Sequence, residues 1–441
     1  MRRPLRSKTD PVEPQIERAL RPGEYIYDRA SFSFVSGLEE VAGRIGAVAA
    51  AEPPRAAALY EAFLAGCHAK ADELDDSSGY FGQFARDLIC LWIKAREAGG
   101  ADADKTVATL LAWMDDDPYA FCYPIEKDAA AAFDKAGLAA FEKRVRARFE
   151  AASAEPSGWP YRHGSEILRA IYCAQRDIDS YVALTERTGL KPEDCLALAK
   201  LHIARRKPGE ALSWVDRGRT LAREKQFGSA AVCDLDKLQR ELLIQLGRQG
   251  EALESAWAEF RKHPSKFTYD DLMKFVPKAE RAAWREKALN AAGGADLHSA
   301  LELLVETKEI DRLADLVRSA SDEALEHVTH YATEPAARKL EKFHSGLAAR
   351  LWRAQGMRIV DAKKSKYYDA ALNNFERARD CYVRAGLATE WERTVRQAIA
   401  AHFRKSGFIG EFQKLAAGEK RGERPSFLAD AKQRWRERLG S

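Results

Sequence analysis

Apolar residues recur at helical spacing along most of the chain, and short polar or glycine-containing breaks interrupt them. The clearest unit is Leu242–Pro264 (LLIQLGRQGEALESAWAEFRKHP), in which two apolar stretches flank a break at Gly247–Gly250. Apolar positions three and four residues apart are typical of an amphipathic helix. This pattern predicts a helix, a short turn and a second helix, which together form a helical hairpin.

Similar hairpins are expected elsewhere along the chain. Gly-Glu-Ala-Leu occurs in the clearest unit and again at Gly209–Leu212. A lone helical hairpin cannot bury its apolar face, whereas stacked hairpins share a continuous core. The sequence therefore predicts an all-α protein, an α-solenoid of stacked helical hairpins, with one compact helical bundle as the alternative. Breaks between paired helices are expected near Arg176, Pro208, Gln249, Lys308 and Ser406.

Composition shifts divide the chain into three parts. Residues 1–30 are rich in proline and charge, which predicts an N-terminal arm. Residues 31–152 carry helical patterns and form a predicted N-terminal helical block. The stretch Ala152–Trp159 (ASAEPSGW) combines small residues with proline and glycine, so it is the expected domain boundary. Residues 160–441 are then the predicted tetratricopeptide-like α-solenoid.

Two long helices and one strand candidate complete the predicted elements. Long helices are expected at Ala336–Gln355 and Tyr367–Ala385. The best strand candidate is the short stretch Tyr25–Phe34, and alternating β-branched runs are otherwise nearly absent. Helix formers such as Ala, Leu, Arg, Glu and Lys dominate the sequence, which favours an all-helical chain.

Charge and cysteine usage restrict the compartment and the class of partner. The 441 residues carry a net charge of +4, from 71 basic and 67 acidic side chains, which is too balanced for a dedicated nucleic-acid binder. Seven cysteines are scattered singly, which favours a reducing compartment. The sequence has neither a signal-peptide pattern nor an apolar run of membrane-spanning length. We therefore expect a cytoplasmic protein without a membrane partner.

The second half of the clearest hairpin resembles the tetratricopeptide repeat. Gly247, the Glu251-Ala252-Leu253 helix start and Pro264 stand where that family places glycine, alanine and proline. More broadly, the chain resembles a bacterial family of helical-repeat proteins of unknown function. The motifs that carry this resemblance are Asp75-Asp76-Ser77-Ser78-Gly79, Trp113-Met114-Asp115-Asp116-Asp117 and the run Tyr367–Phe412.

The run Tyr367–Phe412 is also similar to the helical tail that follows SWIM-type zinc fingers. The zinc finger itself is absent from the sequence, because no Cys-x-Cys pair and no matching Cys-x-His occur. The resemblance therefore implies a helical binding scaffold and brings no catalytic activity with it.

Three residues have the spacing of a metal site. Glu323, His327 and His330 follow one another at intervals of four and three residues, so on one helix they would share a face and could bind a divalent metal. The His-Glu-x-x-His order of zinc proteases is missing. The alternative is a solvated helix end before Tyr331 and Pro335, and we assign no metal ligand.

Other candidate chemistry has simpler explanations. Cys67 and His68 are of the residue types that serve as nucleophile and base, but adjacent helical residues point about 100° apart, so the two side chains do not face each other. We expect Cys67 in the core. The acidic residues Asp72, Asp75, Asp76 and Asp115–Asp117 could bind a cation, but they lack the spacing of a calcium loop. Helix capping and turn formation explain them more simply.

Several basic clusters could follow a phosphate backbone if they shared one face. Acidic residues are interleaved with them, which favours a solvated surface instead. The clusters are Lys143, Arg144, Arg146 and Arg148; Arg205, Arg206 and Lys207; Lys363, Lys364 and Lys366; and Lys432, Arg434, Arg436 and Arg438 around Trp435.

Together these patterns favour a non-enzymatic scaffold that binds a protein or peptide on its helical-repeat surface. The sequence contains no phosphate loop, dinucleotide fingerprint, serine elbow or kinase signature. We therefore assign no catalytic or cofactor-binding residue and expect no cofactor. The alternatives are a nucleic-acid-binding module that uses the basic helices and a metal-dependent enzyme. The nine tryptophans are expected mostly as wedges between helices, with one or two in a binding groove.

Overall fold

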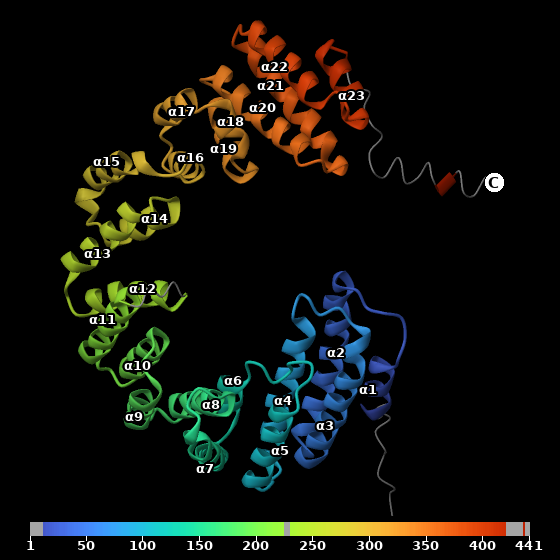
Figure 1. Ribbon diagram of the computed structural model, residues 1–441, viewed down its shortest axis with the longest axis vertical. Helices are drawn as coiled ribbons and strands as arrows, with labels where there is room; N and C mark the ends of the chain where they lie inside the picture. The colour runs from blue at the N-terminus through green and yellow to red at the C-terminus, as the bar shows by residue number, and fades with distance from the viewer. Residues whose placement is uncertain (1–11, 225–229, 420–434, 437–441) are drawn as a thin grey trace, which may run out of the picture. The chain divides into compact units, whose positions relative to one another are not determined.

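The computed structural model describes residues 12–224, 230–419 and 435–436 (Figure 1). Within these ranges the regular elements are helices and no β-strand is present. Ile26 and Leu74 form an isolated parallel β-bridge. The chain divides into two compact units, Met1–Leu246 and Gly247–Ser441.

The helices of the first unit follow one another with short links. They are α1 (Val12–Leu20), α2 (Asp28–Ala49), α3 (Pro53–Lys70), α4 (Tyr80–Ala98), α5 (Ala103–Asp115), α6 (Glu126–Ala132), α7 (Lys135–Ala151), α8 (Trp159–Gln175), α9 (Ile178–Thr188), α10 (Pro192–Ala204), α11 (Pro208–Glu224) and α12 (Ala230–Gln245). Those of the second unit are α13 (Gln249–Lys262), α14 (Lys266–Phe275), α15 (Arg281–Ala291), α16 (Leu297–Glu306), α17 (Ile310–Ser319), α18 (Asp322–His327), α19 (His330–Leu340), α20 (Ser345–Asp361), α21 (Tyr368–Arg384), α22 (Ala388–His402) and α23 (Ser406–Ala416).

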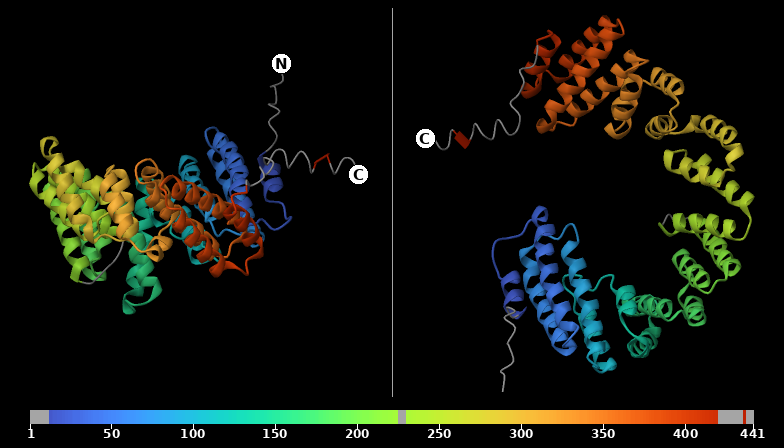
Figure 2. Two further views of the ribbon diagram at one scale, coloured as in Figure 1. Left: turned by 90° about the horizontal axis from the view of Figure 1, so that it is seen from above. Right: turned by 180° about the vertical axis from the view of Figure 1, so that it is seen from behind.

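In each unit, helices pack mainly against helices that lie close to them in the sequence. In the first unit α3 packs between α2 and α4, and α11 packs between α10 and α12. In the second unit α20 packs against α19 and α21, and α21 packs against α22 and α23 (Figures 1 and 2). This succession is that of an α-solenoid of stacked hairpins, which confirms the predicted fold class. The alternative of one compact bundle is wrong.

All five predicted breaks between paired helices are confirmed. At four of them, the residue two positions before the second helix has a positive φ: Arg176 (57°), Arg206 (59°), Gly247 (77°) and Lys308 (59°). The fifth break separates α22 from α23, which begins at Ser406. Gly386 (70°) forms a further left-handed turn between α21 and α22.

Four of these left-handed turns, at Arg176, Arg206, Lys308 and Gly386, close with the same kind of backbone hydrogen bond. The amide of the following residue donates to a carbonyl five residues back, as in Asp177 to Tyr172 (2.9 Å) and Leu387 to Tyr382 (2.9 Å). The bond satisfies one of the carbonyls left open at a helix C-terminus, and the left-handed residue reverses the chain. The recurring hairpin therefore has a recurring turn.

The predicted arm is corrected where the structure describes it. Val12, Ile16 and Leu20, at i, i+4 and i+8, form one apolar face of α1 and are buried in the core of the first unit. Helix α1 packs on both α2 and α3. Residues 1–11 lie outside the described residues. The strand candidate Tyr25–Phe34 is also wrong, because α2 begins at Asp28 and leaves only the Ile26 bridge.

The stretch Ala152–Trp159, which the sequence marks as a domain boundary, lies inside the first compact unit. Phe149 of α7 stacks on Tyr161 of α8 with ring centroids 4.4 Å apart, and both rings are buried. Because apolar side chains pack across this stretch, it is a turn between adjacent helices. The two compact units meet in sequence between Leu246 and Gly247 instead.

Of the two predicted long helices, one is confirmed and one is divided. Helix α21 matches the expected Tyr367–Ala385 within one residue at each end. The expected Ala336–Gln355 is two helices, because α19 ends at Leu340 and α20 begins at Ser345. Gly346, in the first turn of α20, lies where an added Cβ would be 2.7 Å from Leu387, so the new helix start packs closely on the α21–α22 turn.

We predict opposite stability changes for two glycine-to-alanine substitutions in the second unit. Gly386 is left-handed whereas Gly410 lies within α23, and an added Cβ would meet nothing within 4 Å at either position. Gly386→Ala should lower the free energy of unfolding by about 1 kcal/mol, since L-residues disfavour this conformation. Gly410→Ala should raise it by about 0.5–1 kcal/mol through helix propensity. Urea unfolding followed by circular dichroism measures both, and a Gly386→Ala protein as stable as the wild type would contradict the turn assignment.

Candidate functional site

Three chain segments meet at one end of the first unit, where α2 and α4 begin. The Ile26 amide donates to the Glu73 carbonyl (2.9 Å), and the Asp75 amide donates to the Ile26 carbonyl (2.8 Å). The third segment links α5 to α6 and joins the other two through Phe121, whose ring lies 5.6 Å from that of Phe81. Arg86 also donates to the Tyr123 carbonyl (3.0 Å). Residues far apart in sequence therefore share one surface.

Six exposed aromatic side chains gather on these three segments. They are between 36% and 68% exposed. Two pairs are in edge-to-face contact, Tyr25 with Tyr27 (5.3 Å) and Phe32 with Tyr80 (5.4 Å). We call this set the aromatic end surface, and its members are Tyr25, Tyr27, Phe32, Tyr80, Tyr119 and Tyr123.

Two aspartates hold the aromatic end surface in shape. Asp76 accepts from the amides of Phe81 and Gly82 (both 2.8 Å) at the start of α4. Asp117 accepts from the amides of Phe121 and Cys122 (2.8 and 2.6 Å). These bonds satisfy amides that would otherwise be open, as the capping interpretation of the acidic turns predicts. They also fix the two turns that carry the aromatic rings.

The acidic residues of these turns give the surface a negative charge. Residues 71–80 and 115–126 contain Asp72, Glu73, Asp75, Asp76, Asp115–Asp117 and Glu126 but no lysine or arginine. A hydrogen bond from the buried Lys70 ammonium (2.6 Å) lowers the pKa of Glu73. Hydrogen bonds from Ser77 lower the pKa of Asp75. The Tyr119 hydroxyl donates to Asp72, which raises the pKa of Tyr119. The Asp72 carboxylate therefore lies directly beside an exposed ring.

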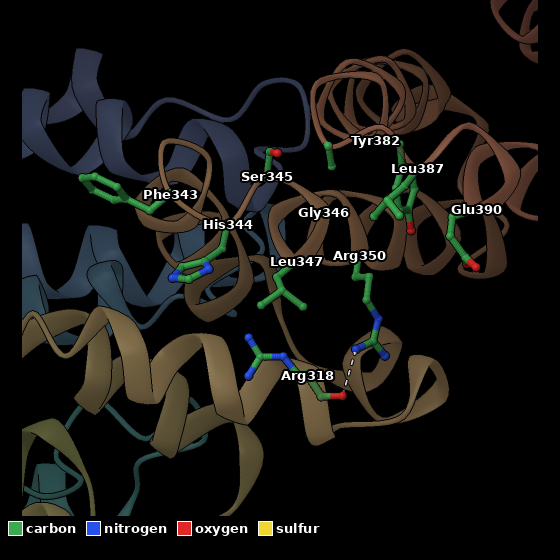
Figure 3. A pocket seen from close by; sticks show the side chains of 11 residues that line it. Arg318, Phe343, His344, Ser345, Gly346, Leu347, Arg350, Tyr382, Leu387 and Glu390 are labelled. Carbon is green, nitrogen blue, oxygen red and sulfur yellow. Dashed lines mark hydrogen bonds between the residues drawn. The ribbon is translucent and has the colours of Figure 1, made fainter.

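The second unit contains a separate pocket beside the start of α20. Its volume is about 400 Å³, and it is lined by residues of α17, α20, α21 and α22 and of the links between them. Figure 3 shows Leu347 in the centre, with His344 on one side and Arg350 on the other. Phe343 and Leu387 are exposed apolar side chains of this pocket.

Arg350 is fully engaged by the protein itself. It donates to Asp322 (3.0 and 2.8 Å) and to the carbonyls of Val317 (2.6 Å) and Ala320 (2.7 Å). A longer contact to the Arg318 carbonyl (3.4 Å) is drawn in Figure 3. The guanidinium thus binds the open carbonyls at the C-terminus of α17 and joins α17 and α18 to α20. Its hydrogen-bond donors therefore hold helices together and are not offered to a ligand.

Asp322 is the centre of a partly buried charge network that includes Arg350 of this pocket. Arg353 (3.4 Å) and Arg393 (3.8 Å) approach it in addition to Arg350, and Arg353 also pairs with Glu326 (3.0 Å). Burial opposes ionisation of Asp322, but the Arg350 hydrogen bond and the three guanidinium charges outweigh it and lower its pKa. Burial raises the pKa of Glu326 despite Arg353. The network neutralises charges between helices.

Glu323, His327 and His330 do not share the one helix face that the metal alternative expects. Glu323 and His327 lie on α18, which ends at His327, whereas His330 begins α19. The His327 ring bonds the Glu323 carbonyl (2.8 Å) through Nδ1, and His330 packs against Tyr331 (4.0 Å). Because the helix breaks at Val328, the three side chains do not share a face. In the described part of the chain, no group of three metal-ligating side chains is present.

Cys67 and His68 have separate surroundings. Cys67 is fully buried, and burial raises the pKa of its thiol to about 12, which keeps it protonated at neutral pH. His68 instead lies against the rings of Tyr119 (5.7 Å) and Phe121 (4.9 Å). The core position expected for Cys67 is confirmed, and His68 forms part of the support of the aromatic end surface.

Much of the basic charge on the described helices is paired. Arg144 pairs with Asp104, Arg146 with Glu142, and Arg148 with Asp115. Arg205 donates to the Arg176 carbonyl, and Lys207 pairs with Glu210. Trp435 and Arg436 are exposed in the structure. The other basic residues of the predicted C-terminal helix, Lys432, Arg434 and Arg438, lie outside the described residues.

The aromatic end surface is not predicted from the sequence, where tryptophan is the aromatic residue that draws attention. Trp92 and Trp352 are indeed buried wedges, and each indole donates to a glutamate, Glu61 and Glu341 respectively (2.7 and 2.8 Å). The exposed rings are tyrosines and a phenylalanine. An available signal was that Tyr80, Tyr119 and Tyr123 stand beside the two acidic turn motifs.

The stacked hairpins place the chain among α-solenoid proteins. Residues 29–411 match a family of unknown function (DUF6880), and the chain belongs to that family. This agrees with the expected membership of a helical-repeat family of unknown function. The resemblance to the tail of SWIM-type proteins and the bacterial origin stay predictions. None of the described helices is both long and apolar enough to span a membrane.

The other comparisons are more distant. No curated protein matches the sequence. Among solved structures, the chain is similar to one in "Structure of Naa15/Naa10 bound to HypK-THB", with 11% sequence identity and a TM-score of 0.35. The similarity covers 92% of this chain and 65% of the solved one, so the chain spans less than two thirds of that protein's length.

We predict that Asp322→Asn lowers the free energy of unfolding by about 3 kcal/mol at pH 7, because it leaves the partly buried Arg350 guanidinium without the Asp322 counter-ion. Asp315→Asn is the matched control, since Asp315 pairs with Arg318 at the surface and is 73% exposed. An exposed pair contributes less than about 1 kcal/mol. Urea unfolding measures the difference, and equal effects of the two variants would contradict the role of Asp322.

The effect of Asp322→Asn should also depend on pH. Because the pKa of Asp322 is lowered in the folded state, its contribution is present above the pKa of an unfolded aspartate, about 3.9, and is lost as the pH falls below it. The stability difference between the wild type and the variant should therefore shrink as the pH is lowered from 5 towards 3. A difference that stays constant across this range would show that the Asp322 charge is not responsible.

Proposed function

We propose that this protein is a non-enzymatic scaffold that binds a protein or peptide partner, and that the aromatic end surface is its main docking site. The observation that carries the proposal is the gathering of six exposed aromatic side chains on three segments of the first unit. Single exposed apolar residues are ordinary on protein surfaces, whereas several such residues on neighbouring segments indicate an interaction site. Tyrosine in particular is enriched where binding energy concentrates.

The rigidity of the surface supports the same proposal. The aspartate caps, the Ile26–Leu74 bridge and the contact of the Ser31 and Ser78 hydroxyls (3.2 Å) all fix its backbone segments. A surface whose backbone is held in place before binding loses little conformational freedom when a partner docks. The aromatic end surface is thus suited to recognition.

The pocket of the second unit gives weaker support for a ligand site, since Arg350 is saturated by protein acceptors. The nucleic-acid alternative is not favoured by the paired arginines of α7. The free thiols of all seven cysteines are consistent with the reducing environment of the cytoplasm, where we propose that the protein acts.

Selection from a random peptide library tests the docking site. We expect peptides selected on the wild-type protein to bind at least about tenfold more weakly to the double variant Phe32→Ala/Tyr80→Ala, which removes one edge-to-face pair, because central aromatic contacts often contribute 2 kcal/mol or more. Fluorescence anisotropy measures the affinities.

The control is the double variant Phe267→Ala/Phe403→Ala, which removes two exposed rings of the second unit (71% and 61% exposed). It should bind the selected peptides as the wild type does. Circular dichroism of each variant establishes that it is folded. Peptides that bind both double variants with wild-type affinity would contradict the assignment of the docking site, and a library without any binder would contradict the peptide-binding function.

A further inference from the structure

The charge around the aromatic end surface restricts the chemistry of its partner. The acidic turns 71–80 and 115–126 carry eight carboxylates and no cation of their own. Lys70, Arg148 and His163 approach Glu73, Asp115 and Glu126 respectively, and the Arg86 guanidinium donates to the Tyr123 carbonyl. The third segment, residues 25–32, contains one acidic and one basic residue, so the eight carboxylates still exceed the cations of this surface. Asp76 and Asp117 bond backbone amides, which carry no net charge, so their negative charges remain uncompensated by these contacts.

The exposed rings add a second preference for cations. The face of an aromatic ring attracts an ammonium or guanidinium group within about 6 Å. The same end of the unit already contains such a contact, because the Lys70 ammonium lies 6.0 Å from the centroid of the Phe34 ring. Exposed faces of Phe32, Tyr80 and Tyr123 offer similar positions to side chains of a partner.

We infer that the partner segment docking on the aromatic end surface is basic, with arginine or lysine side chains placed between the exposed rings and the carboxylates of Asp72 and Asp116. Both carboxylates are exposed, and Asp72 already lies against Tyr119. This inference rests on the proposed function and specifies the partner at the same site. An acidic segment would be repelled by the turns, and an uncharged one would leave the carboxylates unmatched.

The test uses two labelled peptides of equal length, one of alternating arginine and serine and one in which glutamate replaces arginine. The full-length protein should bind the arginine peptide and not the glutamate peptide. Phe32→Ala/Tyr80→Ala should weaken binding of the arginine peptide, because the rings contribute cation–π contacts. Asp72→Asn/Asp116→Asn should weaken it about fivefold, since each exposed ion pair contributes up to about 1 kcal/mol. Raising the salt concentration should reduce binding in the wild type more than in the aspartate variant.

A matched control distinguishes local recognition from general charge. Asp179→Asn/Glu186→Gln removes two exposed carboxylates on α9 of the same unit and should bind the arginine peptide as the wild type does. Equal weakening by both charge-removing variants, or no binding of the arginine peptide, would overturn the inference.

The outcomes separate this inference from the proposed function. If library-selected peptides depend on Phe32 and Tyr80 but are unaffected by Asp72→Asn/Asp116→Asn, the docking site stands and the basic partner is wrong. If neither the selected peptides nor the arginine peptide depends on the aromatic pair, the docking site itself is wrong.

Discussion

Each helix is buried mainly by helices that lie near it in the sequence, and the fold of both units follows from this local packing. Ala, Leu and aromatic side chains line one face of successive helices, and no single hairpin can cover that face alone. The left-handed turns at Arg176, Arg206, Lys308 and Gly386 bring each second helix back along the first. Since the packing is local, the ends and edges of the stack remain available for other uses.

The aromatic end surface is such an end. The starts of α2 and α4 and the link after α5 lie there. Asp76 accepts from amides at the start of α4, and Asp117 accepts from amides of the link. The same acidic turns therefore complete the helices and surround the exposed rings with negative charge. In the second unit, charged side chains bind helix ends inside the packing instead. Asp322 and Arg350 connect α17, α18 and α20. The carboxylates of the first unit therefore lie on a surface, whereas Asp322 and Arg350 of the second unit hold helices together.

The fold class and hairpin breaks could be predicted because they depend on local pattern. Turns at Arg176 and Lys308 follow from apolar spacing on either side, and the capping role of Asp76 follows from the turn motif in front of α4. The burial of α1 could not be predicted, since its apolar face is short and its partners, α2 and α3, lie further along the chain. The aromatic end surface depends on contacts such as Ile26 with Leu74 and Phe81 with Phe121, which no local spacing reveals. The same limit applies to the shared helix face expected for Glu323, His327 and His330, because helical spacing does not continue across the break at Val328.

Hydrogen–deuterium exchange of the full-length protein, with and without a saturating bound peptide, locates the docking site on the chain. We expect slower exchange in the peptide complex at residues 25–32, 71–80 and 115–125, with little change in the second unit. Protection confined to the second unit, or to helices of the first unit away from these three segments, would contradict it.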